Sequence, residues 1–328
     1  MQPFKYTRAA DAGGAVAAVF GNRETKFIAG GTNLLDLMKE GVENPAALVD
    51  VTRLNLAQIR STSSGISIGA VAKNTDTANH PLVRRDYPLL TQAIAAGASA
   101  QIRNMATNGG NLMQRTRCSY FYDVSTPCNK REPGSGCGAM EGINRTHAIF
   151  GWSDKCIAVH PSDMAVALAA LNASVSVQGK DGKTRVIAFA DLHRLPGDTP
   201  DRDNTLEHGE LITSIEIPKN SFNHSYYLKV RDRASYAFAL VSVAAAMETK
   251  GGVINGEPRI AMGGVAHKPW RALAAEKYLA GKKASEENFT AAADAEMKQA
   301  KPLEHNKFKV ELGKRAIVHA LMRANGMA

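Results

Sequence analysis

Short apolar runs and helix-like apolar spacing alternate along the first third of the chain. The apolar run Lys26 to Ala29 predicts a strand, and the glycine-rich residues after it predict a turn. Asn33 to Glu40 then predicts a helix that ends at the following glycine. Ala47 to Val51 and Gly65 to Ile68 predict two more strands. Leucine, isoleucine and alanine on one face then predict a single helix from Pro88 to Ile102, which leads into another glycine-rich turn.

The apolar periodicity fails between Arg115 and Asp154, where Gly, Pro, Cys, Asn and basic residues dominate. This composition is typical of a loop, and so long a loop inside a compact domain is usually functional or disordered. Regular structure resumes with a predicted helix from Pro161 to Leu171 and predicted strands at Ala173 to Gln178 and Glu210 to Ile217.

The pattern changes after Pro218 and predicts a second domain, with a boundary near residue 220. Three antiparallel strands are expected at Ser225 to Lys229, Phe238 to Met247 and Arg259 to Gly263, followed by helices from Trp270 through Ala328. The predicted fold class is therefore α+β, with a larger domain at 1–220 and a smaller domain at 221–328.

Composition narrows the class of protein. With 328 residues, 44% of them hydrophobic, the chain can bury a substantial core. Its longest weakly polar run, Ala234 to Met247, is too short to cross a bilayer, and the N-terminus carries no recognisable export signal. We therefore expect no membrane association and a cytoplasmic location, or a periplasmic one if a partner carries a twin-arginine signal. The formal charge of +9 is spread along the chain without a basic run, which argues against nucleic-acid binding.

Two glycine-rich turns carry the first candidate chemistry. Gly30-Gly31-Thr32-Asn33 joins a predicted strand to a predicted helix, where backbone N–H groups attract anions and glycine lets a phosphate come close. A simpler interpretation is that Asn33 only caps the helix. Thr107 to Asn111 repeats this chemistry, so the two turns together predict a dinucleotide diphosphate site. Neither turn has G-x-G-x-x-G spacing, which argues against a nicotinamide Rossmann domain.

Four segments, in this order, resemble the FAD-binding subunits of the xanthine dehydrogenase and aldehyde oxidoreductase family of molybdenum hydroxylases. They are FIAGGTNLLDLMK (27–39), IRNMATNGGNL (102–112), HPSDMAVALAAL (160–171) and ELITSIEIP (210–218). The resemblance covers nearly the whole chain. It implies an FAD-binding domain of the PCMH type with two subdomains, followed by a smaller α/β domain like that of carbon monoxide dehydrogenase flavoproteins.

The resemblance also implies which residues bind FAD. In the family the first glycine motif wraps the pyrophosphate and the second supports it from the opposite side. The aspartate of the P-S-D motif contacts the flavin side of the cofactor, and a lysine after the domain boundary approaches the isoalloxazine ring. The matching positions are Lys26, Phe27, Ile28, Ala29, Gly30, Gly31, Thr32, Asn33, Leu34, Thr107, Asn108, Gly110, Asn111, Asp163, Ile212 and Lys229. Taken alone, Asp163 would be interpreted as a helix-terminal carboxylate and Lys229 as a solvated lysine.

All four cysteines lie in the irregular part of the chain, residues 113–158, which we call the cysteine segment. Cys118, Cys128, Cys137 and Cys156 have the spacings C-x9-C, C-x8-C and C-x18-C, which match neither zinc-finger nor ferredoxin patterns and fix no metal. The segment resembles the insert of family members with an additional 4Fe–4S cluster, among them flavoprotein subunits of hydroxybenzoyl-CoA reductase and of a bacterial aldehyde oxidoreductase group. This resemblance implies a 4Fe–4S cluster bound by these thiolates. Structural zinc and two disulfides remain alternatives.

Six cations of the same segment are expected to compensate the negative charge of such a cluster. They are Arg115, Arg117, Lys130, Arg131, Arg145 and Lys155.

By resemblance, two partners complete the enzyme: a large subunit that binds the molybdenum cofactor and a small subunit with two 2Fe–2S clusters. Electrons from these subunits would reach FAD and then an external acceptor, so the chemistry belongs to the cofactors and no catalytic side chain is expected here. The cysteine segment favours an aldehyde over a purine substrate. The alternatives are a hydroxybenzoyl-CoA-reductase-like complex, a flavin enzyme that works without partners, and a zinc-stabilised nucleic-acid-binding module.

Overall fold

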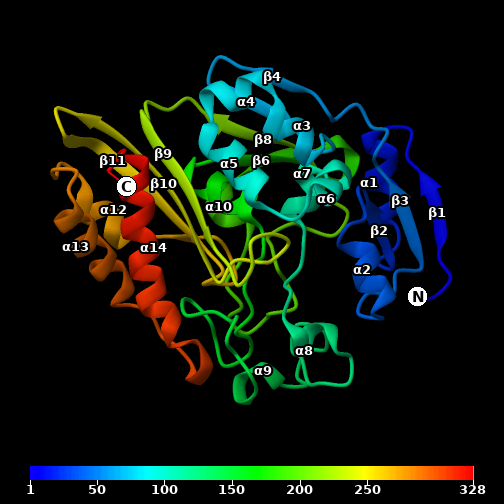
Figure 1. Cartoon of the computed structure of the whole chain (residues 1–328). Coiled ribbons are helices and arrows are strands. Elements are labelled where there is room, and N and C mark those ends of the chain that lie inside the picture. The colour runs from blue at the N-terminus through cyan, green and yellow to red at the C-terminus, as the bar shows by residue number, and fades with distance from the viewer. Residues whose placement is uncertain (328) are drawn as a thin grey trace.

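Three separate β-sheets, each with its own helices, organise the chain. The computed structural model describes residues 1–327, and Figure 1 shows the three sheets side by side, with the cysteine segment projecting below them. The mixed α and β content of both domains confirms the predicted fold class. No helix within residues 1–327 combines the length and the apolar character that a bilayer-spanning segment requires.

The first sheet is small and entirely parallel. Its strand order is β1-β3-β2, and the strands are β1 (Lys5–Arg8), β2 (Thr25–Ile28) and β3 (Ala47–Asp50). Parallel neighbours require crossover connections, and helices α1 (Ala12–Phe20) and α2 (Leu34–Lys39) provide them. Asp11 caps α1 by accepting a hydrogen bond from the backbone N of Gly14 at 2.7 Å. The observed order of strand β2, turn and helix α2 at residues 25–39 agrees with the prediction from the sequence.

The second sheet has five antiparallel strands in the order β4-β5-β8-β6-β7. The strands are β4 (Ile59–Ser61), β5 (Gly65–Gly69), β6 (Ser174–Gln178), β7 (Thr184–Ala188) and β8 (Leu211–Pro218). The helices of this unit are α3 (Asn74–Asn79), α4 (Pro81–Asp86), α5 (Pro88–Ala96), α6 (Ala100–Met105), α7 (Asn108–Leu112), α10 (Asp163–Ala170), the 3-10 turn η1 (Lys180–Gly182) and α11 (Phe189–Leu192). Ile66 on β5 pairs with Ile217 on β8, so two strands that are far apart in sequence lie side by side, and the cysteine segment lies between them along the chain.

The third sheet is also antiparallel, in the order β12-β11-β10-β9. Its strands are β9 (His224–Val230), β10 (Val241–Lys250), β11 (Val253–Gly263) and β12 (Trp270–Arg271), so a two-residue fourth strand joins the three that were predicted. The helices that follow are α12 (Leu273–Leu279), α13 (Glu286–Met297), the 3-10 turn η2 (Glu304–Asn306) and α14 (Phe308–Ala324). Helices were predicted as far as Ala328, which lies outside the described residues.

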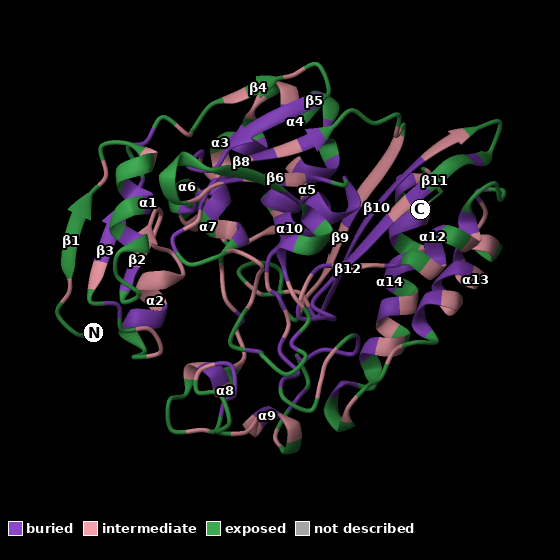
Figure 2. Cartoon of the chain, turned by 180° about the vertical axis from the view of Figure 1, so that it is seen from behind, coloured by how far each residue is buried: buried purple, intermediate pink, exposed green. Residues whose placement is uncertain are grey.

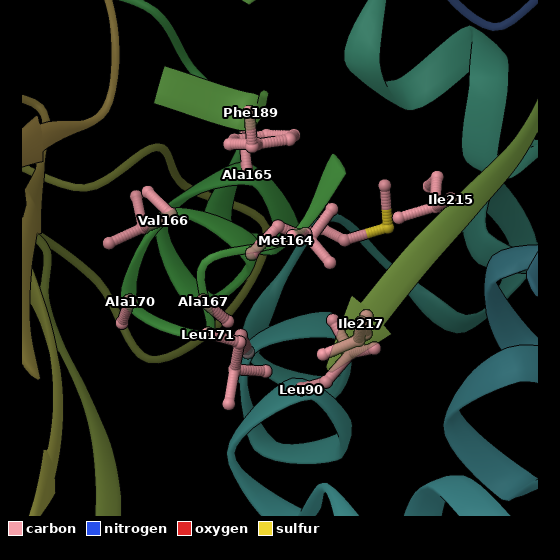
Figure 3. Close-up of a cluster of buried hydrophobic side chains, with 14 of the residues drawn as sticks. Leu90, Met164, Ala165, Val166, Ala167, Ala170, Leu171, Phe189, Ile215 and Ile217 are labelled. Carbon is pink, nitrogen blue, oxygen red and sulfur yellow. The ribbon is translucent and has the colours of Figure 1, made fainter. Parts of the chain in front are cut away.

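Strand β10 and helix α10 join the second and third units. Alternate residues of β10 face opposite sides: Val243 and Ala245 contact the core under α12–α14, whereas Ala244 and Ala246 contact the core that contains α10. Both sides are covered, so β10 is buried over most of its length (Figure 2). All eight residues of α10 are buried, and Figure 3 shows the side chain of Met164 extending from this helix toward Ile215 on β8.

One predicted helix is wrong. The stretch Pro88 to Ile102 forms two helices, α5 and α6, separated at Gly97 and Ala98, and Ala98 has a positive φ of 48°. Ser99 starts the second helix by accepting a hydrogen bond from the backbone N of Ile102 at 3.3 Å. The apolar spacing continues through the break, but only α5 buries its apolar side, in the core of the second unit, whereas no residue of α6 is buried. The glycine-rich turn predicted after it is instead the short helix α7.

Candidate functional site

A cavity of about 550 Å³ lies where the first and second units meet. We call it the glycine-lined cavity, because the loop between β2 and α2 and the start of α7 form two of its walls. The third wall is the loop that leads into β8. The lining residues that carry the argument are 26–34, Thr107, Gly109, Gly110, Arg115 and 201–212.

The first glycine turn packs tightly against the end of α6. A Cβ atom at Gly30 would lie 2.1 Å from the carbonyl oxygen of Met105, so only glycine fits there, and Gly31 has a φ of +71°. Asn33 does not cap α2, which excludes the simpler interpretation of this residue. Its Oδ1 accepts a hydrogen bond from the backbone N of Arg115 at 2.9 Å, and its buried Nδ2 lies beside the hydroxyl of Tyr122. The Asn33 side chain therefore holds the glycine turn against the start of the cysteine segment.

The second glycine turn contributes mostly backbone. Thr107 caps α7, because its Oγ1 accepts a hydrogen bond from the N of Gly110 at 3.2 Å. The side chain of Asn108 is buried and bonds to Asn74 and Thr77, away from the cavity. Asn111 likewise points inward and accepts a hydrogen bond from Ser162. Of the predicted residues in this turn, Thr107 and Gly110 line the cavity, and the two asparagines hold the turn in place.

Asp163 and Lys229 form a buried ion pair, and neither residue lines the glycine-lined cavity. Lys229 Nζ lies 2.7 Å from Asp163 Oδ2, and the hydroxyl of Tyr227 donates to Asp163 Oδ1 at 2.7 Å. The two charged side chains are only 4% and 8% exposed. Burial and the nearby Asp163 raise the pKa of Tyr227 well above its ordinary value. The pair joins α10 to β9, so Asp163 and Lys229 are not brought together with residues 26–34, whereas Ile212 is.

The four cysteines border one small cavity, which we call the cysteine cavity. Cys128 and Cys137 lie opposite each other in an isolated antiparallel bridge, and all four thiols are free of disulfide bonds. Helices α8 (Ser119–Tyr122) and α9 (Gly138–Glu141) are the only regular elements around it in residues 115–154. Burial raises the pKa of Cys118 to about 12 and that of Cys156 to about 11, so these two unliganded thiols are protonated at neutral pH.

Comparison with known proteins identifies the family. Residues 2–220 match the model of the FAD binding domain in molybdopterin dehydrogenase. The chain belongs to this family. Residues 226–325 match the C-terminal domain of the carbon monoxide dehydrogenase flavoprotein, so this member of the family has both domains of an oxidoreductase flavoprotein subunit.

Relatives of this FAD-domain protein match it over most or all of its length. The aldehyde oxidoreductase FAD-binding subunit PaoB of Escherichia coli (strain K12) is 49% identical over 100% of both chains. The glyceraldehyde dehydrogenase medium chain of Sulfolobus acidocaldarius is 30% identical over 87% of this chain and 83% of its own. Among solved structures, carbon monoxide dehydrogenase from Hydrogenophaga pseudoflava superposes with a TM-score of 0.78 at 26% identity, covering 100% of both chains.

The residues of the glycine-lined cavity fit the FAD that the family binds. The cavity has the volume of an ordinary cofactor site, and two of its walls are glycine-rich, which lets backbone N–H groups come close to a phosphate. The sequence analysis missed the third wall, Asp201 to Leu211, and also missed Arg115. The loop has no periodicity, and its only clue was its position directly before Ile212.

The six cations that were expected to compensate a cluster already have partners within the chain. Five of the six cations are paired with carboxylates: Arg115 with Glu43 and Asp203, Arg117 with Asp36, Lys130 with Asp203, Arg145 with Asp232, and Lys155 with Asp154. The sixth, Arg131, donates to the carbonyl oxygens of Tyr120 and Phe121 at 2.9 and 2.8 Å and also to that of Thr126. These cations stabilise the loop, because their charge is already balanced by the rest of the chain.

Proposed function

We propose that this chain is the FAD- and 4Fe–4S-containing electron-transfer subunit of a heterotrimeric, molybdenum-dependent aldehyde oxidoreductase. Residues 1–220 would form the FAD-binding domain and residues 221–328 the C-terminal domain. A large subunit with the molybdenum cofactor and a small subunit with two 2Fe–2S clusters would deliver electrons, and an external acceptor would take them from FAD. The aldehyde substrate is proposed from the similarity to PaoB, an aldehyde oxidoreductase FAD-binding subunit.

The observation that carries the FAD part is the glycine-lined cavity, in which Gly30 packs so closely on the carbonyl oxygen of Met105 that no side chain fits. FAD would supply electron exchange between one-electron and two-electron partners. We propose that residues 26–34, with Thr107, Gly110 and Ile212, bind and orient it. Asn108 and Asn111 would act indirectly by holding α7, and the Asp163–Lys229 pair would act by fixing α10 against β9.

The cluster part is supported by the position of all four cysteines of the cysteine segment around one cavity. Tetrahedral zinc needs four ligand atoms about 2.3 Å from one point, and the structure arranges no three His, Cys, Asp or Glu side chains of residues 1–327 to bind a single ion in that way. The cavity measures about 10 Å³, so a 4Fe–4S cluster would have to move the four thiols outward as it binds. Since the thiols of Cys118 and Cys156 are protonated when free, binding iron would release their protons.

The imidazole of His147 is a further group at this cavity. Its Nε2 lies 3.1 Å from the Sγ of Cys118, and burial lowers the pKa of His147 to about 4, so the ring is neutral. We propose that it hydrogen-bonds the cysteine sulfur and thereby helps to set the reduction potential of the cluster.

The absorption spectrum of the purified chain, oxidised and then reduced with dithionite, tests the proposal when iron, sulfide and zinc are measured on the same sample. Flavin bands over a broad iron–sulfur shoulder, with about four irons per FAD, are expected. Zinc in place of iron would contradict the cluster and retain the FAD assignment. A colourless protein would contradict both. With the complete complex, turnover of an aldehyde but not of an aromatic acyl-CoA would separate the two directions of electron flow.

A further inference from the structure

A buried salt bridge through the carboxylate of Asp203 connects the glycine-lined cavity with the cysteine cavity. Asp203 lines the first of these, and its two oxygens bind different partners. Oδ2 accepts a hydrogen bond from Nε of Arg115 at 2.7 Å, and Oδ1 accepts one from Nζ of Lys130 at 2.5 Å. Lys130 lines the cysteine cavity and lies two positions after Cys128. The two cavities are therefore one side-chain contact apart.

This connection is largely shielded from water. The side chain of Lys130 is 1% exposed, and those of Arg115 and Asp203 are 19% and 21% exposed. The ammonium of Lys130 also donates to the carbonyl oxygen of Pro200 at 2.7 Å, which fixes it beside the loop that carries Asp203. Arg115 also donates a hydrogen bond from Nη1 to Oε1 of Glu43 at 2.7 Å, and its guanidinium lies 4.8 Å from the centre of the Phe121 ring. Ion pairs in such surroundings couple much more strongly than exposed pairs.

The charges around Asp203 leave it no other counterion. Burial opposes ionisation of its carboxyl, but Lys130 and Arg115 hold the pKa of Asp203 well below its ordinary value. His267 Nε2 lies 3.8 Å from Asp203 Oδ1, yet burial lowers the pKa of His267 to about 4, so this ring is neutral at pH 7. Displacing Lys130 therefore leaves a buried carboxylate with Arg115 as its one cation among the described residues.

We propose that Asp203 couples the two cavities, so that FAD binding orders the cysteine segment and an ordered cysteine segment strengthens FAD binding. This inference rests on the proposed function. FAD in the glycine-lined cavity would fix the loop 201–212, which lines it, and the fixed Asp203 would hold Lys130 and the chain around Cys128. Such coupling acts equally in both directions. Asp203 and Lys130 are positioning residues, and neither needs to touch reacting atoms.

Hydrogen–deuterium exchange of residues 113–137, with and without FAD, tests the coupling on the full chain. In the unaltered protein, FAD is expected to slow exchange there. Lys130→Met removes the contact without touching the glycine-lined cavity, so the FAD-dependent protection is expected to disappear and FAD affinity to fall about tenfold, within the usual range of coupling. Lys130→Arg keeps the charge and is expected to restore most of the protection.

Lys155→Met is the matched control. Lys155 also lines the cysteine cavity, but its ion pair is with exposed Asp154, so this variant should keep the protection. If Lys130→Met does not fold, Asp203→Asn at saturating FAD should lose the protection in its place. Unchanged exchange in a chain that binds FAD would overturn the coupling and leave the proposed function standing. Failure to bind FAD at all would overturn the proposed function itself.

Discussion

The glycine-lined cavity and the cysteine cavity lie close together but are held by different means. The first is formed by backbone: a strand, two short helices and close packing such as that of Gly30 on Met105. The second is formed by a loop whose shape depends on side chains that bond to backbone groups. Asn129 Oδ1 accepts from the N atoms of Gly134 and Gly136 at 3.1 and 2.9 Å, and Arg131 donates to several carbonyls. Changes of backbone should therefore damage the first site, and changes of polar side chains the second.

The cysteine segment is also anchored at two points outside itself. Near its start, fully buried Phe121 packs with Leu37 of α2, and burial of such a ring is worth roughly 1.5–3 kcal/mol. Near its end, Phe150 stacks on Trp270 of β12 with ring centres 4.9 Å apart. The loop therefore needs the first and third units to be folded, whereas the glycine-lined cavity needs the first and second.

The largest effect is expected from Gly30→Ala. The added methyl would have to occupy space 2.1 Å from a backbone oxygen, which no side-chain movement can relieve, so α6 and the glycine turn must separate. We expect FAD affinity to fall by about a hundredfold or more, equivalent to about 3 kcal/mol. Titration of the FAD-free chain with FAD measures this dissociation constant.

Gly14→Ala is the control for this change. Gly14 lies in α1, where an added Cβ would make only ordinary contact at 3.5 Å and alanine favours the helix. This variant should bind FAD normally and be slightly more stable. Normal FAD binding by Gly30→Ala would contradict the assignment of the first glycine turn.

Acid should destabilise the region between the two sites. Burial lowers the pKa of His267 from 6.5 to about 4, and burial also lowers the pKa values of its neighbours His160 and His193. The unfolded chain therefore binds more protons than the folded chain between pH 6.5 and 4, so the free energy of unfolding falls as pH falls through this window. The loss for His267 alone is on the order of 3 kcal/mol.

Urea unfolding at several pH values measures this dependence. His267→Asn keeps a donor for the carbonyl oxygen of Arg194, which His267 Nδ1 contacts at 2.8 Å, and it should flatten the acid side of the curve. His319→Asn, at an exposed position on α14, should leave the curve unchanged. An equally steep curve for His267→Asn would exclude this histidine as a source of acid sensitivity.

A smaller and more local effect is expected from Arg131→Gln. The shorter side chain cannot reach the carbonyl oxygens of Tyr120, Phe121 and Thr126 together, so the loop around Cys118 and Cys128 loosens. We expect iron per chain to fall to about half or less, while FAD content changes little because Arg131 does not line the glycine-lined cavity.

The comparison with Lys155→Gln decides how specific that loss is. Lys155 is a cation of the same segment whose ion pair is exposed, so its neutralisation should retain iron. Equal loss of FAD and iron in Arg131→Gln would show that the two sites do not differ in the way described above.

The sequence predicted regular elements best where local pattern and tertiary packing agree. The strand-turn-helix around Gly30 and the strands β8 to β11 follow their hydrophobic pattern. The break between α5 and α6 was missed because the apolar spacing runs on through Gly97, and only the positive φ of Ala98 marks it. Several short elements, including β1, β4 and α3, were not predicted because three to six residues carry too little periodicity.

The candidate site was predictable from sequence only in part. The glycine turns can be recognised in the sequence, since glycine is required where two backbone segments come close. The cysteines can be recognised because they cluster in one segment. The partners of the cations could not be predicted from the sequence. Asp203 lies 88 positions from Arg115 and 73 from Lys130, and nothing in a single sequence links them. For the same reason Asp163 and Lys229 gave no sign of pairing with each other.

The smallest effect is expected from Thr107→Val, and it separates two roles for a residue that lines the glycine-lined cavity. The Thr107 hydroxyl caps α7, so replacing it with a methyl of similar size should cost about 1 kcal/mol of stability. If capping is its main role, FAD affinity should fall by no more than about threefold, and Thr107→Ser, which keeps the hydroxyl, should restore both values. A much larger loss of FAD affinity at unchanged stability would instead make the hydroxyl a direct ligand of FAD. Thermal unfolding and FAD titration of the two variants give the answer, because a cap stabilises the helix with or without FAD, whereas a ligand contributes only when FAD is bound.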